Sequence, residues 1–132
     1  MRKKAVKIKT NALTGRALDW AVARAVGYES IRISSSTKDI LIGYIDRPVI
    51  YSPTWDWNQI PALLIDYRIA VIPERCTEAA FSGGWYASFY FDDEKQHTTN
   101  ICDTPQIAIC RAVVAAQLGD EVEIPDELLE EK

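Results

Sequence analysis

A strongly apolar helix is predicted near the C-terminal end of this sequence, in the segment DTPQIAICRAVVAAQLGD. Thr104 stands where an N-cap belongs, Pro105 occupies the first helical position, and Gly119 follows where the helix should end. Apolar side chains spread over more than one face of this helix: Ile107, Ile109, Cys110, Val113, Val114, Ala116 and Leu118. Because so wide an apolar surface must be covered, the segment predicts a folded protein in which this helix packs against a sheet.

A second helix and several strands are predicted from the rest of the sequence. Residues 15–26 show apolar side chains at helical spacing, with Thr14 as the N-cap and Gly27 after the last turn. The polar residues expected on the solvent side of this helix are Arg16, Asp19 and Arg24. Strands are predicted at residues 5–10, 30–35, 39–45, 48–51 and 83–91. Residues 60–74 indicate a short helix that runs into a strand, and residues 92–100 indicate an exposed loop.

The length of the chain and the order of its elements predict one α+β domain. The 132 residues fall within the ordinary size of a single domain. Strands that alternate with apolar helices predict a central sheet with helices on its faces, and the short connections predict a mixed, mainly antiparallel sheet. We expect two main helices and one short helix within residues 1–119, followed by an acidic tail at residues 120–132.

Charge is distributed unevenly along the chain. Residues 1–66 carry ten Lys and Arg against six Asp and Glu, whereas residues 67–132 carry five against thirteen. Seven of these acidic residues lie between Asp120 and Glu131. An end this acidic repels phosphate backbones, so nucleic acid is not an expected partner and a basic protein surface suits the chain better. The alternative is a solvated, partly disordered end, which is the commoner meaning of such a charge run.

No catalytic, metal-binding or cofactor-binding set is predicted. Three cysteines, Cys76, Cys102 and Cys110, match no metal-ligand spacing and are expected to be buried thiols in a reducing compartment. The single histidine, His97, is expected on the solvated surface. A hydrolase that uses Asp92, Asp93 and His97 is the weakest of the hypotheses for this chain. No glycine-rich phosphate-binding motif and no apolar run long enough to span a membrane are present, so we expect a cytoplasmic protein without a cofactor.

The segment YSPTWDWNQ, residues 51–59, is the strongest candidate for a binding site. Tyr51, Trp55 and Trp57 can stack on the ring of a ligand, or they can anchor the loop to the core, and anchoring is the favoured interpretation. In that case Tyr51 and Trp57 are expected to be the better buried pair. Trp55 and Asp56 then remain as the exposed residues with a functional role, and Trp85 is a further candidate for the wall of a ligand pocket.

Three blocks of the sequence resemble a known family. The segments LTGRALDWAVARAVG, YSPTWDW followed by NQI, and DTPQIAICRAVVAAQLGDEVEIPDEL are similar to small phage and prophage proteins of the NinX type. The segments GWYASFYF and TPQIAICRA also resemble the phage ABA-sandwich domain. The similarity runs from about Leu13 to Leu129 and departs from the usual pattern between Arg68 and Gly83. It implies a three-layer α/β/α sandwich encoded by a temperate phage or prophage, with no established activity.

Two functions from different classes follow from these observations. The first is a non-enzymatic accessory phage protein that binds a host or phage protein, for example to inhibit a host nuclease or defence complex. The alternative is a small-molecule or nucleotide-binding module whose pocket is lined by Tyr51, Trp55, Trp57 and Trp85. The oligomeric state stays open between monomer and homodimer. The strand edge at residues 6–9 offers a place for pairing across a two-fold axis, whereas its lysines oppose such pairing.

Overall fold

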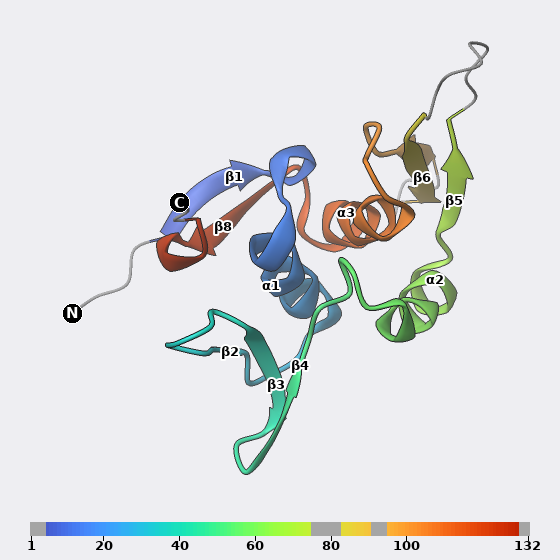
Figure 1. Ribbon diagram of the computed structural model, residues 1–132. Helices are drawn as coiled ribbons and strands as arrows, with labels where there is room; N and C mark the ends of the chain where they lie inside the picture. Colours follow the sequence, from blue (N-terminus) through green and yellow to red (C-terminus); the bar gives the residue numbers. More distant parts are fainter. Residues whose placement is uncertain (1–4, 75–82, 91–94, 130–132) are drawn as a thin grey trace.

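Figure 1 shows the computed structural model, which describes residues 5–74, 83–90 and 95–129. Three α-helices are present in this part of the chain: α1 (Gly15–Val26), α2 (Pro61–Tyr67) and α3 (Pro105–Leu118). Short 3₁₀ helices are η1 (Thr10–Ala12), η2 (Trp57–Gln59) and η3 (Asp126–Leu128). The strands are β1 (Ala5–Lys9), β2 (Arg32–Ile33), β3 (Ile40–Tyr44), β4 (Arg47–Ile50), β5 (Ala70–Pro73), β6 (Trp85–Tyr90), β7 (Gln96–Thr98) and β8 (Glu121–Pro125).

The strands form three separate sheets around the two long helices. Their orders are β1-β8, β2-β3-β4 and β5-β6-β7, and every strand pair in the described residues is antiparallel. The α1 helix packs against α3, β8 and β3, and α3 packs against β6 and β5 (Figure 1). The predicted α+β class, the antiparallel pairing, and the two long helices with one short helix are therefore confirmed.

The layering differs from the single central sheet that was expected, because the long helices lie in the middle and the sheets lie around them (Figure 1). The physical reason is the apolar surface of α3. Its buried residues occupy most of its circumference: Gln106, Ala108, Ile109, Cys110, Arg111, Ala112, Val113 and Val114. A helix that is mostly apolar and buried nearly all round must be covered on several sides, and one sheet face covers only one of them.

Both long helices have threonine as the N-cap residue, but only one of these side chains makes a capping hydrogen bond. The Thr104 side chain accepts a hydrogen bond from the Ile107 backbone N–H at 3.2 Å, as the sequence predicts for an N-cap. Thr14 also has extended backbone at the N-cap of α1, but its side chain makes no capping hydrogen bond. Gly27 ends α1 with a positive φ of 99°, a conformation that favours glycine.

Replacing Thr104 with alanine is expected to lower the free energy of unfolding by about 1 kcal/mol, because the Ile107 N–H loses its partner. The matched control is Thr14→Ala, which removes the same atoms from a side chain that makes no capping hydrogen bond. Urea denaturation of the two variants and the unmodified protein measures the difference. Equal losses in both variants would show that the hydrogen bond at Thr104 contributes nothing specific.

The acidic residues that follow α3 form part of a β-ribbon. Residues 121–125 make up β8, and β8 pairs with β1 so that Lys7 stands opposite Glu123 and Lys9 opposite Glu121. Val122 and Ile124 lie on the other face of the ribbon and are buried. The ordered fold thus continues beyond residue 119, in contrast to the partly disordered end considered above. The basic start and the acidic end of the chain are brought together, which explains their opposite charges.

The segment after β6 also differs from the prediction. Gln96–Thr98 is strand β7, paired with β6, whereas composition predicted an exposed loop at residues 92–100. The pairing extends one residue further, because the Thr99 N–H donates to the Ala87 carbonyl at 2.9 Å. The Thr99 Oγ1 accepts a hydrogen bond from the Ala87 N–H at 3.0 Å. These contacts satisfy backbone groups on the edge of β6 that does not pair with β5. The polar composition of residues 92–100 carries no sign of this pairing, because the need for it arises from a different segment.

Candidate functional site

The loop between β4 and α2 carries the aromatic segment, and Tyr51 anchors it. The Tyr51 side chain is buried, and its ring meets that of Tyr28 edge-on, with 5.4 Å between ring centroids. The Tyr51 N–H donates to the Ile40 carbonyl at 2.8 Å, which continues the β3–β4 pairing into the loop. Burial raises the pKa of the Tyr51 hydroxyl. The predicted burial of Tyr51 is therefore confirmed.

Both tryptophans of the loop are exposed. Trp55 is 70% exposed, as expected, but Trp57 is 54% exposed, so the prediction that Trp57 is buried with Tyr51 is wrong. The reason is local, since Trp57 begins the 3₁₀ helix η2, in which no residue is buried. The Asp56 carboxylate caps η2 by accepting a hydrogen bond from the Asn58 N–H at 3.0 Å.

A buried carboxylate of α1 holds this loop in place. Asp19 is only 3% exposed, although the sequence predicted it on the solvent side of its helix. Its Oδ1 accepts a hydrogen bond from the Thr54 N–H at 2.9 Å, and its Oδ2 accepts one from the Thr54 hydroxyl at 3.2 Å. Burial raises the pKa of Asp19 to about 6, although the hydrogen bonds from Thr54 and the charge of Arg16 act in the opposite direction.

A cavity of about 360 Å³ lies between the loop, the first turns of α1 and the start of β3. Its lining residues are Gly15, Arg16, Asp19, Asp39, Ile40, Ile50, Tyr51, Ser52, Thr54 and Trp55. Arg16 and Asp39 form an ion pair at 3.2 Å on its wall. The pKa of Asp39 is lowered by the hydrogen bond from the Thr37 hydroxyl and by Arg16. The cavity thus combines an exposed indole with three charged side chains, Arg16, Asp19 and Asp39.

The structure unites only part of the predicted site. Tyr51 and Trp55 line the same cavity, whereas Asp56 and Trp57 do not. Trp85 lies in a different sheet, on β6, where it pairs with Cys102. The sequence did not identify Asp19, Arg16 and Asp39 as members of this site. Its one available signal for Asp19 was an acidic residue one helical turn after Arg16.

Two further hollows are lined by residues of α1 or of the aromatic loop. One, of about 300 Å³, lies between β3, β4 and α2 and is lined mainly by Tyr28, Val49, Tyr51, Leu63 and Tyr67. The other, of about 430 Å³, lies between α1 and β8. In the latter, the Arg24 guanidinium already stacks on the Trp20 ring at 5.2 Å from its centroid, so this aromatic surface is covered by the protein itself.

The histidine and cysteine expectations have mixed outcomes. His97 lies on β7, half-buried and stacked on Phe89 with 5.6 Å between ring centroids, so its expected place on the solvated surface is wrong. Asp92 and Asp93 lie outside the described residues, as does Cys76. Cys102 and Cys110 are buried free thiols, as predicted, and burial raises the pKa of Cys110. Within the described ranges, no cluster of His, Cys, Asp and Glu has the arrangement of a metal site.

The sequence of the chain matches the model of a known protein family. Residues 9–117 match the family model described as bacteriophage P22 NinX. The chain belongs to the NinX family. The match extends from the end of β1 to the last turn of α3, so it includes α1, the aromatic loop and the whole cavity of this NinX-family protein. No curated protein matches the chain. In the part of the chain that the structure describes, no helix has the length and hydrophobicity needed to cross a membrane.

Proposed function

We propose that this NinX-family protein is a non-enzymatic phage accessory factor that binds a host or phage protein in the cytoplasm of the bacterial host. The supporting observation is the concentration of exposed apolar side chains in one stretch of the chain. Twelve large apolar residues are exposed among those described, and seven of them lie between residues 44 and 65. We define the hairpin surface as the exposed apolar residues of the two hairpin faces, its turn and the loop after it: Tyr44, Ile45, Val49, Ile50 and Trp55.

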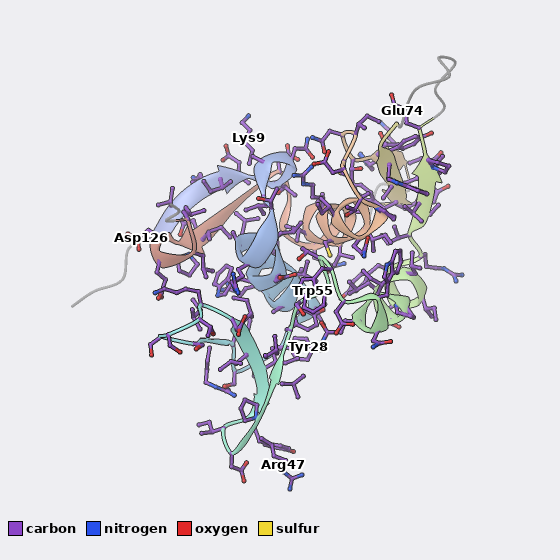
Figure 2. The ribbon with its side chains drawn as sticks, in the orientation of Figure 1. Lys9, Tyr28, Arg47, Trp55, Glu74 and Asp126 are labelled. Atoms are coloured by element: carbon purple, nitrogen blue, oxygen red, sulfur yellow. The ribbon has the colours of Figure 1, made fainter. Side chains whose placement is uncertain are left out.

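The shape of the hairpin supports this role. The β3–β4 hairpin projects away from the helices, with Arg47 near its tip (Figures 1 and 2). Tyr44 and Ile45, at the turn, are 79% and 80% exposed. Turns are ordinarily polar, and exposed apolar clusters on soluble proteins commonly mark interaction sites. A protein partner that covers these side chains gains free energy by removing them from water. Inhibition of a host defence complex is one form that this binding can take.

The outer edge of β4 is blocked by the side chain of Gln59. We therefore expect the hairpin surface to bind a partner through its side chains. The Gln59 carboxamide accepts a hydrogen bond from the Ser52 N–H at 2.7 Å and donates one to the Ile50 carbonyl at 3.0 Å. The side chain thus satisfies the edge groups that a neighbouring strand would use. Pro48 in the same strand has no N–H to donate. Addition of a partner strand at this edge is therefore disfavoured.

Replacing Gln59 with alanine is expected to open this edge. The loss of two hydrogen bonds lowers the free energy of unfolding by about 1 kcal/mol, and the exposed edge promotes self-association that increases with protein concentration. Sedimentation velocity at several concentrations measures the association. Asn58→Ala is the control, because Asn58 uses its backbone N–H in the loop. A Gln59→Ala variant as monodisperse and as stable as the control would contradict the blocking role.

Site-specific photo-crosslinking tests the proposed function. A photoreactive amino acid replaces Ile45 in the hairpin surface and, as the control, Lys7 on the distant β1–β8 ribbon. In infected host cells, we expect one defined protein to be joined to position 45 and absent from position 7. A Tyr44→Asp and Val49→Asp double variant should lose this adduct. No specific adduct at position 45, the same adducts at both positions, or an adduct with a second copy of this chain would overturn the proposal.

A second candidate function, binding of a small molecule, is favoured by the cavity beside Trp55. Its volume of about 360 Å³ lies within the usual range of small-molecule sites. Thermal denaturation in the presence of nucleotides and sugars tests it. A ligand at about 100 times its dissociation constant should stabilise the fold by about 2.7 kcal/mol. An unchanged melting temperature with all of these compounds would argue against this candidate.

A further inference from the structure

We propose that the cavity beside Trp55 receives a basic side chain, the guanidinium of arginine or the ammonium of lysine, from the partner protein. This inference rests on the proposed function and names the chemistry that the partner presents. Ile50 and Trp55 belong to the hairpin surface and also line the cavity, so a partner that covers this part of the hairpin surface also reaches the cavity. With this contact, binding would require a positively charged side chain on the partner, a selectivity that the apolar side chains alone do not supply.

The charges of the cavity favour a cation. Two carboxylates, Asp19 and Asp39, line it, and Arg16 is the cationic side chain on its wall. Arg16 is bound to Asp39 through its Nε and Nη2 atoms, at 3.3 and 3.2 Å. Asp19 accepts its hydrogen bonds from Thr54, and both of those bonds come from neutral groups. The raised pKa of Asp19 has the same cause, because its charge is taken out of water without full compensation.

The Trp55 indole supplies a second element of cation recognition. Figure 2 shows Trp55 on the loop that leaves β4, beside α1. Its ring is exposed, whereas the ring of Trp20 is already used by Arg24. The backbone of the preceding residue, Thr54, is bound to Asp19, so the loop that carries the indole is fixed relative to the carboxylate. A cation between an aromatic face and a carboxylate gains from both.

An anion fits the same cavity less well. The first turn of α1 lies at the cavity, and a helix N-terminus attracts negative charge. However, the Arg16 guanidinium is held by Asp39, and an entering anion would also approach the desolvated carboxylate of Asp19. Repulsion in a site partly shielded from water is stronger than at the open surface. The balance of charges therefore selects a basic group.

A titration followed by nuclear magnetic resonance tests the inference. The probe is Nα-acetylarginine amide, and the control probe is the corresponding citrulline derivative, which is neutral and similar in shape. We expect a saturable shift of the Trp55 indole N–H signal with the arginine probe and none with the citrulline probe. Trp57, exposed in the same loop but outside the cavity, is the internal control and should not shift. The Trp55→Phe variant identifies its signal.

Variants of the carboxylates sharpen the test. Asp19→Asn and Asp39→Asn each keep the shape of the side chain and should weaken binding of the probe about tenfold, whereas Trp57→Phe should leave it unchanged. No saturable shift, an equal shift with citrulline, or undiminished binding in both carboxylate variants would overturn the inference. Photo-crosslinking from position 45 separates the two proposals. If the partner adduct forms in wild type but the probe does not bind, the cavity inference fails and the proposed function stands; if no adduct forms, the proposed function fails.

Discussion

Replacing Arg111 with methionine is expected to lower the free energy of unfolding by about 3 kcal/mol, because Arg111 is a buried tether at the centre of the fold. Its Nε donates to the Leu13 carbonyl at 3.0 Å, and its Nη1 lies 3.3 Å from both the Asn100 Oδ1 and the Cys102 Sγ. Arg111, on α3, thereby binds Leu13 just before α1 and also binds Asn100 and Cys102 just before α3. Methionine fills similar space but leaves the buried Leu13 carbonyl without its donor.

The matched control for this prediction is Arg24→Met. Arg24 is exposed and lies over the Trp20 ring, so its loss is expected to change the free energy of unfolding by less than about 1 kcal/mol. Urea denaturation gives both values, and thermal denaturation should show a drop of about 10 °C for the Arg111 variant. An Arg111→Lys variant should recover only part of the loss, since an ammonium cannot reproduce the fork of the guanidinium. If Arg111→Met were as stable as Arg24→Met, the stabilising role of the Arg111 hydrogen bonds would be disproved.

Replacing Asp19 with asparagine is expected to remove a pH dependence of stability. The pKa of Asp19 is about 6 in the fold, against an ordinary value of 3.8, so the folded state holds this proton more tightly than the unfolded chain. The stability that Asp19 contributes is therefore greatest below pH 3.8 and falls as the pH rises to about 6. Two pKa units correspond to about 3 kcal/mol, an order-of-magnitude value. Asparagine keeps the contact to Thr54 without the buried charge.

The measurement is the difference in unfolding free energy between the Asp19→Asn variant and the unmodified protein across this pH range. We expect the variant to gain relative stability as the pH rises. The groups that face Asp19 from its surroundings are Arg16 on α1, Tyr51 on the loop and Cys110 on α3, and the last two stay neutral throughout the range. Asp39→Asn is the control of opposite sign, because the pKa of Asp39 is lowered in the fold. A constant difference between the Asp19 variant and the unmodified protein would contradict the prediction.

The elements that the sequence predicted well are those with local causes. Thr104, Pro105 and Gly119 mark the ends of α3 through capping geometry that depends on a few neighbouring residues. The alternation of Val6 and Ile8 with two lysines likewise predicts β1 correctly. The blocks that resemble the NinX family carried enough information to identify it, and the match at residues 9–117 confirms this. The resemblance to the ABA-sandwich domain stays a prediction.

The candidate site was predicted only in part, because its members come from separate elements. Trp55 and Tyr51 were found from the composition of one loop. The sequence predicts Asp19 on the solvent side because an acidic residue in a helix is usually solvated, and no local pattern shows that Thr54 will cover it. Trp85 is a candidate by its chemistry alone, and it stands on β6, in a different sheet from the β3–β4 hairpin that precedes the loop.

The sequence by itself determined the α+β class, the limits of the long helices, the buried thiols of Cys102 and Cys110, and the family of this protein. These properties follow from short-range spacing, capping and burial preferences, which leave their marks within a few residues. Only the tertiary structure decided the three separate sheets, the pairing of the acidic β8 with the basic β1, and the cavity between α1 and the aromatic loop. Those arrangements depend on which distant segments cover one another, and a buried Asp19 or Arg111 becomes acceptable only when a partner from elsewhere in the chain satisfies it.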